Sequence, residues 1–175
     1  SSIHFTTTKE SLTRVQQLIG DSQFTYNVGS LSLSDLKDFK PVEKFILYDK
    51  FKIENKPFAL VTFHPETVSV KSNSVYAREM RNALAVISDS IFVVVTMPNA
   101  DTLGSVFREE LYQLRDEKPG NVILVENFGK TNYFSAMRYS SLLIGNTSSG
   151  IIEAASFNKY VVNVGDRQKG REQSS

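Results

Sequence analysis

Five short apolar runs constrain the fold of this chain more than any other feature of its sequence. They occupy residues 58–63, 91–95, 122–125, 141–144 and 160–164, and none of them alternates regularly between apolar and polar side chains. A strand with one face in water shows such alternation, whereas a strand that is covered on both faces is apolar throughout. The runs therefore predict a buried sheet with other elements packed on both of its faces.

Amphipathic segments separate these runs. Two of them carry apolar side chains at a spacing of three or four residues: Tyr76, Met80, Ala83, Leu84 and Ile87 in one, and Leu103, Val106, Phe107, Leu111 and Leu114 in the other. This spacing is typical of one face of a helix. Repeated strand–helix units build parallel sheets through right-handed crossovers. We therefore expect an α/β fold, a Rossmann-like parallel sheet sandwiched by helices.

The first fifty residues are less regular. Their pattern predicts a helix over residues 11–19, a strand over residues 24–28 and a second helix over residues 41–52. The chain begins without Met and stops shortly after a stretch punctuated by glycine. We interpret it as a fragment of a longer protein. In this interpretation residues 1–50 are a lead-in from a missing N-terminal domain and the start of the next domain. Residues 51–175 are then a Rossmann-like domain that is truncated at its C-terminus.

Composition excludes several classes of partner. The formal net charge is +1, so no strong field favours nucleic acid or an anionic membrane surface. Cysteine is absent, which excludes disulfides and thiolate metal sites and suits a cytoplasmic protein. No apolar stretch has the length of a membrane span, and no signal peptide is visible. We expect a cytoplasmic protein that needs no metal or cofactor.

Polar residues that directly follow the apolar runs are the candidates for a site, because ligands of open parallel sheets bind outside the carboxyl ends of the strands. His64 can donate to an oxyanion or transfer a proton there, or it is a loop histidine satisfied by its neighbours. Asn99 is open to ligand binding, whereas Asp101 is interpreted as a helix cap. Phe128 can flank a base but is interpreted as packing, and Tyr133 is interpreted as core.

The stretch at residues 145–150 is the most informative, because glycines stand at both of its ends and Thr147, Ser148 and Ser149 lie between them. Glycine permits a tight turn and a close backbone approach, and the N-terminus of a helix favours phosphate. Glu153 follows in the first turn, where it can accept hydrogen bonds from ribose hydroxyls or simply favour the helix dipole. The stretch matches neither a Walker loop nor the GxGxxG fingerprint of dinucleotide sites.

Two arginines follow the last apolar run. The guanidinium groups of Arg167 and Arg171 suit phosphate oxygens, although a short basic loop is also common in a solvated position. Taken together, the residues after the strands indicate a parallel α/β domain that binds a phosphorylated, hydroxyl-bearing ligand. They do not specify a reaction.

Two motifs go further and resemble a known family. Residues 144–154 read IGNTSSGIIEA and residues 163–171 read NVGDRQKGR. Both motifs, and the spacing between them, closely resemble the UDP-N-acetylglucosamine 2-epimerase family. Residues 60–65 (LVTFHP) and 98–101 (PNAD) resemble its hydrolysing branch, whereas the non-hydrolysing branch usually has His followed by Arg-Arg-Glu. The match covers almost the whole chain.

The resemblance implies the C-terminal half of a GT-B-like fold, the two-domain fold of UDP-glycosyltransferases and epimerases, with its active site in the cleft. It assigns His64 a catalytic position beside the diphosphate and the reacting sugar. Around the UDP it places Asn99 and Asp101 at the border, Phe128 near the uracil, Thr147, Ser148, Ser149 and Gly150 at the phosphates, Glu153 on the ribose and Arg167 on the diphosphate.

The reaction implied by the resemblance begins with loss of the C2 proton and anti elimination of UDP from UDP-N-acetylglucosamine, which gives a glycal. Hydrolysing members then add water and release N-acetylmannosamine for sialic-acid-type sugars, and related members use a diacetamido-trideoxy sugar. The implied partners are UDP, a UDP-N-acetylhexosamine and an N-terminal domain that carries the proton-transfer carboxylates. The parent enzyme is expected to be a homo-oligomer. The chain alone is expected to bind UDP weakly and not to turn over. Thr147 departs mildly from the family, in which Ser is usual.

Three alternatives remain open at this point. The donor domain of a GT-B glycosyltransferase would share the glycine-rich turn and the ribose glutamate, but not both the His-Pro and the Asp-Arg-Gln-Lys-Gly-Arg motifs. A non-catalytic α/β module would bind a nucleotide for regulation or assembly. A purely structural domain would bind no ligand.

Overall fold

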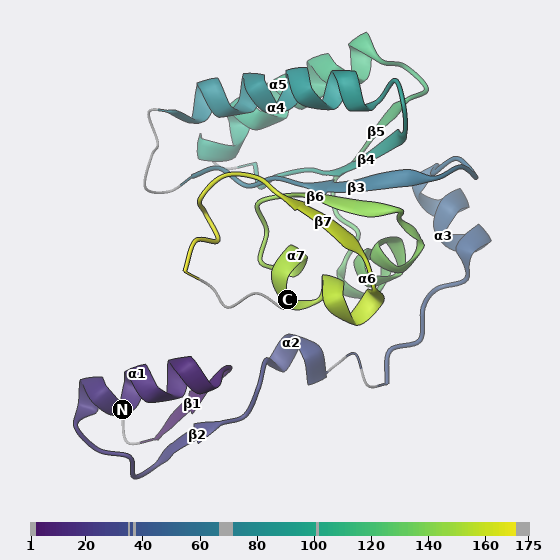
Figure 1. Cartoon of the computed structure of the whole chain (residues 1–175). Helices are drawn as coiled ribbons and strands as arrows, with labels where there is room; N and C mark the ends of the chain where they lie inside the picture. The colour runs from purple at the N-terminus through teal and green to yellow at the C-terminus, as the bar shows by residue number, and fades with distance from the viewer. Residues whose placement is uncertain (1–2, 35, 37, 67–71, 101, 171–175) are drawn as a thin grey trace. The chain divides into compact units, whose positions relative to one another are not determined.

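A computed structural model describes residues 3–34, 36, 38–66, 72–100 and 102–170. The chain divides into two compact units, Ser1–Lys40 and Pro41–Ser175. Figure 1 shows the course of the chain through both.

The first unit is a small βαβ arrangement. It contains, in order, β1 (His4–Thr6), α1 (Lys9–Ile19), β2 (Thr25–Asn27) and α2 (Leu31–Ser34). The two strands pair in parallel. Thr8 caps α1, since its Oγ1 accepts a hydrogen bond from the backbone N–H of Ser11 at 3.1 Å. Gly20 ends the helix in the left-handed conformation. The helix and strand expected here are therefore present, with slightly different bounds.

The second unit contains the predicted parallel sheet. Its elements are α3 (Lys44–Phe51), β3 (Phe58–Thr62), α4 (Asn73–Ile87), β4 (Phe92–Thr96), α5 (Thr102–Glu117), β5 (Val122–Val125), α6 (Lys130–Tyr139), β6 (Leu142–Gly145), α7 (Ser149–Ile152), the 3-10 helix η2 (Ala154–Phe157) and β7 (Tyr160–Asn163). All strand pairs are parallel, in the order β5-β4-β3-β6-β7. Each apolar run of the sequence forms one strand, and the expected α/β fold is confirmed.

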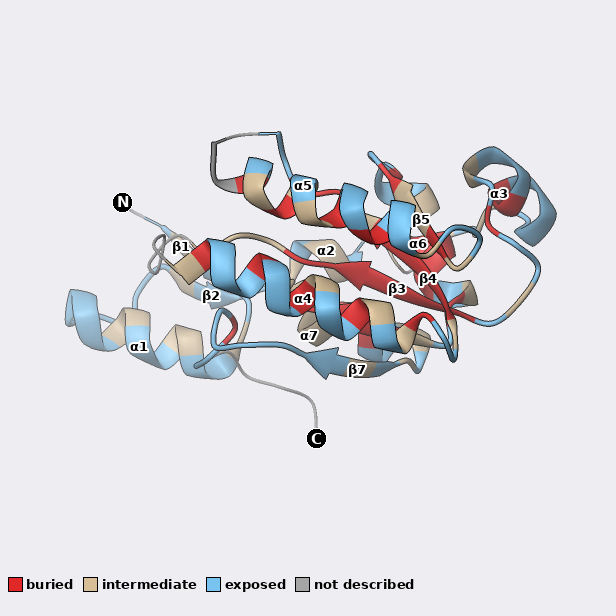
Figure 2. Ribbon diagram, turned by 90° about the horizontal axis from the view of Figure 1, so that it is seen from above, coloured by how far each residue is buried: buried red, intermediate tan, exposed pale blue. Residues whose placement is uncertain are grey.

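Apolar cores lie on both faces of this sheet, and the helices cover both faces (Figure 1). Along β3, Ala59 and Val61 join the core beneath α4 and α5, whereas Phe58 and Leu60 join the core against α3 and α6. In Figure 2 the central strands are almost wholly buried. Because successive residues point to opposite faces, burial on both faces requires the uninterrupted apolar runs seen in the sequence.

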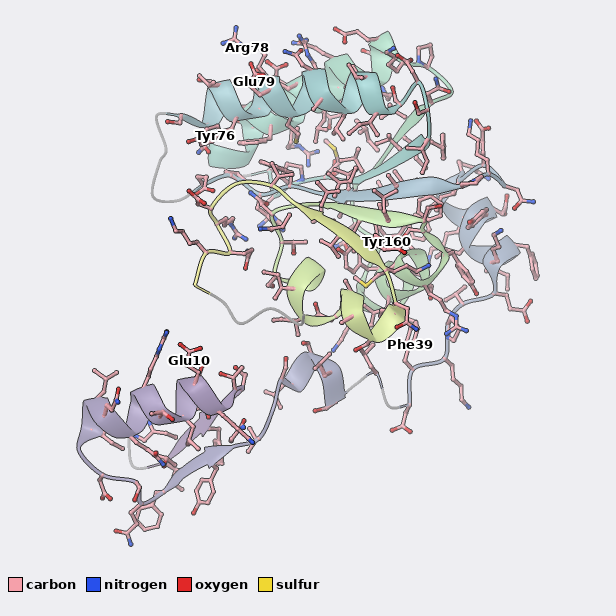
Figure 3. All side chains as sticks on the ribbon, viewed as in Figure 1. Glu10, Phe39, Tyr76, Arg78, Glu79 and Tyr160 are labelled. Atoms are coloured by element: carbon pink, nitrogen blue, oxygen red, sulfur yellow. The ribbon has the colours of Figure 1, made fainter. Side chains whose placement is uncertain are left out.

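Strand β7 forms one edge of the sheet and is much more exposed than the strands inside it (Figure 2). Tyr160, labelled in Figure 3, is 84% exposed, and Val162 is 49% exposed. Beside this edge lies a groove of about 600 Å³, whose lining includes Val162 of β7 together with Tyr76 and Met80 of α4. Among the described residues, no helix is long and apolar enough to cross a bilayer.

Candidate functional site

The strand order places a topological switch point between β3 and β6. From β3 the chain proceeds outward through β4 to β5, whereas β6 and β7 lie on the other side of β3. The chain therefore leaves β3 and β6 toward opposite faces of the sheet, and ligands of open α/β sheets bind at the carboxyl ends of the strands at such a point. His64 follows β3, and the glycine- and hydroxyl-rich turn at residues 145–150 follows β6.

Gly145 brings the two strands unusually close at this point. Its φ is +151°, and a Cβ built on it would lie 1.8 Å from the backbone carbonyl oxygen of Thr62. No side chain fits in that space, and the conformation itself disfavours L-residues. The sequence requires glycine here because the turn starts directly against the backbone of β3.

Asn146, the next residue, ties the turn to the histidine loop. Its side-chain Oδ1 accepts a hydrogen bond from the backbone N–H of His64 at 2.8 Å, and its Nδ2 donates to the backbone carbonyl of His64 at 2.7 Å. Asn146 is only 1% exposed, so both bonds are sheltered from water. Sequence analysis missed this residue, although it lies inside the motif that was singled out.

The loop after β7 reaches the same residue. A guanidinium nitrogen of Arg167 donates to the backbone carbonyl of Asn146 at 3.3 Å, and Nε2 of the buried Gln168 donates to the same oxygen at 2.8 Å. The structure therefore brings together His64, the hydroxyl-rich turn and Arg167 from three separate loops. Gln168 was not among the predicted site residues, yet its Oε1 is buried and finds no hydrogen-bond partner within the residues that the structure describes.

The electrostatic state of His64 follows from this arrangement. Burial lowers the pKa of the imidazole below its ordinary value of 6.5, and the positive charge of nearby Arg167 lowers it further. A histidine in such a place stays neutral near pH 7 and keeps a ring nitrogen that can accept a proton. An anion bound beside Arg167 would offset the second of these effects.

The turn itself carries three half-buried hydroxyl side chains. Oγ1 of Thr147 accepts a hydrogen bond from the backbone N–H of Ser149 at 3.4 Å. Ser148 precedes α7 and makes no side-chain capping bond. Gly150 packs closely on β7, since a Cβ there would lie 3.0 Å from a methyl group of Val161. The helix that follows is a single turn, so the polar groups of this stretch come from the turn rather than from a long helix.

Glu153 lies below the turn and is 6% exposed. Its Oε2 is buried and has no hydrogen-bond partner among the described residues. Tyr133 lies near it, and the Tyr133 hydroxyl is 3.2 Å from Oγ1 of Thr62. Burial raises the pKa of Tyr133, the charge of Glu153 adds to that rise, and hydrogen bonds to Thr62 and Ser149 oppose it. Tyr133 was interpreted as core, but its hydroxyl belongs to this polar cluster. An unpartnered buried carboxylate oxygen is an acceptor in need of a donor.

The remaining predicted residues lie farther along the same edge. Asn99 is exposed in the loop after β4, and Asp101 lies outside the described residues. Phe128 is 3% exposed, with its ring centroid 4.5 Å from that of Phe51 and 6.4 Å from that of Tyr133. This burial and these ring contacts fit the packing interpretation of the Phe128 ring.

An ion pair joins the loops after β4 and β5. Arg108 of α5 donates to the backbone carbonyl of Pro98 at 2.9 Å and pairs with the Glu126 carboxylate through both guanidinium NH2 groups. This contact lowers the pKa of Glu126. It fixes the loop that carries Asn99 against its neighbour. In the described part of the chain, no group of three or more His, Asp or Glu side chains is placed to hold a metal ion.

Comparisons with known proteins identify the family of the chain. The family model for UDP-N-acetylglucosamine 2-epimerase matches residues 1–175. The "GDP/UDP-N,N'-diacetylbacillosamine 2-epimerase (hydrolyzing)" of Campylobacter jejuni is 30% identical over 172 residues, which are 98% of this chain and 44% of that protein. The "Polysialic acid biosynthesis protein P7" of Escherichia coli is 32% identical over 172 residues, which are 98% of this chain and 43% of that protein.

Solved structures show the same fold. The UDP-GlcNAc 2-epimerase of Neisseria meningitidis, crystallised with UDP-GlcNAc, matches with a TM-score of 0.69 at 18% identity, over 95% of this chain and 45% of that one. This match confirms the expected fold class, a Rossmann-like half of a GT-B-like fold. The chain spans less than half the length of these relatives. With its full length matched by the family model, the chain belongs to the UDP-N-acetylglucosamine 2-epimerase family.

Proposed function

We propose that this chain is the UDP-binding half of a hydrolysing UDP-N-acetylhexosamine 2-epimerase. The observation that carries the proposal is the convergence of Arg167 and the hydroxyl-rich turn on Asn146, beside His64. A guanidinium and several hydroxyl groups at the carboxyl edge of a parallel sheet suit a diphosphate. Family membership supports the same ligand class.

Each of these residues is assigned to one part of the UDP. Arg167 neutralises the diphosphate, and Thr147, Ser148, Ser149 and Gly150 contact its oxygens through hydroxyl and backbone N–H groups. Glu153 accepts hydrogen bonds from the ribose hydroxyls, for which its unpartnered Oε2 is suited. Asn99, which is exposed, and Asp101 border the nucleotide. We assign the Phe128 ring to packing rather than to the uracil, because it is buried.

The proposed reaction of the longer protein needs groups that this chain supplies only in part. Loss of the C2 proton and anti elimination of UDP break the C1–O bond and give a glycal. UDP leaves in this step, and addition of water to the glycal then yields the free 2-epimer. We assign His64, whose lowered pKa favours the neutral imidazole, to the diphosphate and the reacting sugar. The carboxylates that move the C2 proton come from the remaining part of the longer protein. We propose that the longer protein is a cytoplasmic homo-oligomer.

The sugar is a UDP-linked 2-acetamido hexose. The names of two relatives support an amino sugar of the sialic-acid type. One is an N,N'-diacetylbacillosamine 2-epimerase of Campylobacter jejuni, and the other is a polysialic acid biosynthesis protein of Escherichia coli. Both N-acetylglucosamine and a diacetamido-trideoxy sugar fit this class. A direct comparison of the two UDP-sugars as substrates of the longer protein would select between them.

Calorimetry on this chain with UDP, UDP-N-acetylglucosamine and ADP tests the proposal. We expect heat from both uridine ligands and less from ADP. Equal binding of UDP and ADP, or binding of neither, would contradict the nucleotide assignment. For the longer protein, release of free N-acetylmannosamine or its diacetamido counterpart supports hydrolysis, whereas a UDP-linked 2-epimer indicates the non-hydrolysing reaction. Transfer of the sugar to an acceptor would instead indicate a glycosyltransferase.

A further inference from the structure

The carboxamide of Asn146 makes a closed pair of hydrogen bonds with the backbone of His64. Oδ1 accepts from the His64 N–H at 2.8 Å, and Nδ2 donates to the His64 carbonyl at 2.7 Å. The two residues are 82 positions apart in sequence. Only a carboxamide offers an acceptor and a donor side by side in this way. The position therefore requires Asn for both bonds, and a carboxylate or an aliphatic side chain of similar size would lose one or both.

A second asparagine holds the other end of the same loop. Oδ1 of Asn73, at the start of α4, accepts from the backbone N–H of Glu66 at 2.9 Å, and its Nδ2 donates to the Glu66 carbonyl at 3.0 Å. Asn73 is 4% exposed. The short segment from His64 to Glu66 thus lies between two buried carboxamides, each of which pairs with one residue of its backbone.

The backbone of Asn146 makes hydrogen bonds with three other residues. Its N–H donates to the carbonyl of Thr62 at 3.3 Å, and its carbonyl accepts from Arg167 at 3.3 Å and from Gln168 at 2.8 Å. One residue thus contacts the end of β3, the histidine loop and the loop after β7. A shift of Asn146 would move His64 and Arg167 relative to each other.

We infer that Asn146 is a positioning residue. Its carboxamide fixes the backbone of His64, from which the imidazole projects, and its carbonyl holds the guanidinium of Arg167, while Asn73 supports the histidine loop from its far end. The relative position of the His64 imidazole and the Arg167 guanidinium matters because of the proposed function, on which this inference rests: both groups contact one UDP-sugar. Groups that act together on a ligand need a fixed geometry, which comes from the residues behind them. Asn146 itself need not touch the ligand to have this effect.

Asn146→Asp and Asn146→Ala distinguish the contributions of the two hydrogen bonds between the Asn146 side chain and the His64 backbone. The aspartate keeps an acceptor for the His64 N–H but places a second carboxylate oxygen against the His64 carbonyl, where no donor remains. The alanine removes both bonds. Asn132→Ala is the matched control, because Nδ2 of Asn132 also bonds a backbone carbonyl, that of Phe128 at 2.7 Å, in the loop after β5 rather than in the histidine loop.

The first measurement is the pKa of His64 in the folded chain, followed by NMR through its imidazole proton. Both Asn146 variants should raise this pKa toward the value of a free histidine, about 6.5, because the ring moves away from Arg167 and into water. Asn132→Ala should leave it unchanged. A loss of overall stability alone does not move the pKa of a folded molecule. Should the Asn146 variants fail to fold, Asn73→Ala measures the same effect from the other end of the loop, and an unchanged His64 pKa there would overturn the inference.

The second measurement is the affinity for UDP, which we expect to fall about tenfold in Asn146→Asp, a loss of about 1.4 kcal/mol. Wild-type affinity together with a wild-type His64 pKa in that variant would overturn the positioning role. If the unaltered chain binds no UDP but the Asn146 variants still shift the His64 pKa, the proposed function fails for this chain while the positioning role stands. The two hypotheses are therefore distinguished by one set of variants.

Discussion

The guanidinium of Arg167 donates a hydrogen bond to the backbone carbonyl of Asn146, 3.3 Å away, and this bond joins the loop after β7 to the turn after β6. The contact leaves other N–H groups of the guanidinium available, since arginine has five donors. One side chain is thus able to support the turn and also to meet an anion in front of it. Several consequences of this arrangement are open to measurement.

Replacing Arg167 with alanine should weaken UDP binding by about 1.5–3 kcal/mol, the usual contribution of a hydrogen bond to a charged group. Arg167→Lys should recover only part of the loss, because an ammonium lacks the planar fork of donors. Calorimetry with UDP measures both. Arg115→Ala is the control, since this arginine lies on α5 with 48% of its side chain exposed and pairs with Asp116. An Arg167→Ala variant that binds UDP as the unaltered chain does would remove the diphosphate assignment.

We expect Glu153 to lower the stability of the ligand-free chain and to strengthen the binding of UDP. Its buried Oε2 has no hydrogen-bond partner in the described part of the chain, and a neutral amide is easier to bury than a carboxylate. Glu153→Gln should therefore raise Tm, by about 2–4 °C for each kcal/mol gained in a domain of this size. The same variant should lose the preference for UDP over 2′-deoxy-UDP that the unaltered chain is expected to have.

Thermal melts and calorimetry with the two nucleotides test this pair of effects. Glu109→Gln on the exposed face of α5 gives the effect of the same charge change away from the site. A Glu153→Gln variant that is less stable, or that still discriminates against the deoxynucleotide, would contradict the ribose role.

Gly145→Ala should destabilise the second unit by about 3 kcal/mol or more, because its Cβ would overlap the carbonyl oxygen of Thr62. The matched control is Gly120→Ala. Gly120 also has a positive φ, +80°, but no atom lies within 4 Å of its added Cβ, so only the conformational cost of about 1–2 kcal/mol remains. Urea unfolding compares the two. If both variants lost the same free energy of unfolding, the close approach of β6 to β3 would not contribute to the effect of Gly145→Ala.

The stability of the chain should fall in mildly acidic solution because of His64. Burial and Arg167 hold the pKa of His64 below that of the unfolded chain, about 6.5. As the pH falls through this value the unfolded state takes up a proton that the folded state refuses, so the free energy of unfolding decreases until the pH reaches the folded pKa.

His64→Gln should remove this contribution, so that its unfolding midpoint in urea changes less between about pH 7.5 and about pH 5.5 than that of the unaltered chain. His4→Gln is the parallel variant, since His4 is the other histidine and lies in the other compact unit. A His64→Gln variant with the full pH dependence would show that the imidazole is not held neutral by its surroundings.

The sheet was predictable from sequence because burial on both faces leaves a direct trace in it. Val93 and Val94 belong to cores on opposite faces, so neither position tolerates a polar residue. Residues 145–150 were predictable as a turn because glycine and hydroxyl residues are dense there. Both signals are local, and each is contained in a few consecutive residues.

Asn146 was not predictable in its role because its partners are remote. Its carboxamide pairs with the backbone of His64, and a backbone group leaves no mark in the residue type of its neighbour. Tyr133 was interpreted as core because its ring fits a helix face, whereas its hydroxyl reaches Thr62 across the fold. Helix periodicity reports where a side chain points and not what its polar tip meets.

The close approach at Gly145 also limits how this site can change during evolution or engineering. The contact between β6 and β3 at this point is made by peptide backbone, that of Gly145 and of Thr62, and substitution leaves the polarity of backbone groups unaltered. New ligand preferences have to arise in the surrounding loops, where residues 64–66, 97–100 and 126–129 leave the sheet. A library aimed at a different sugar or base is best confined to those segments, with Gly145 kept fixed.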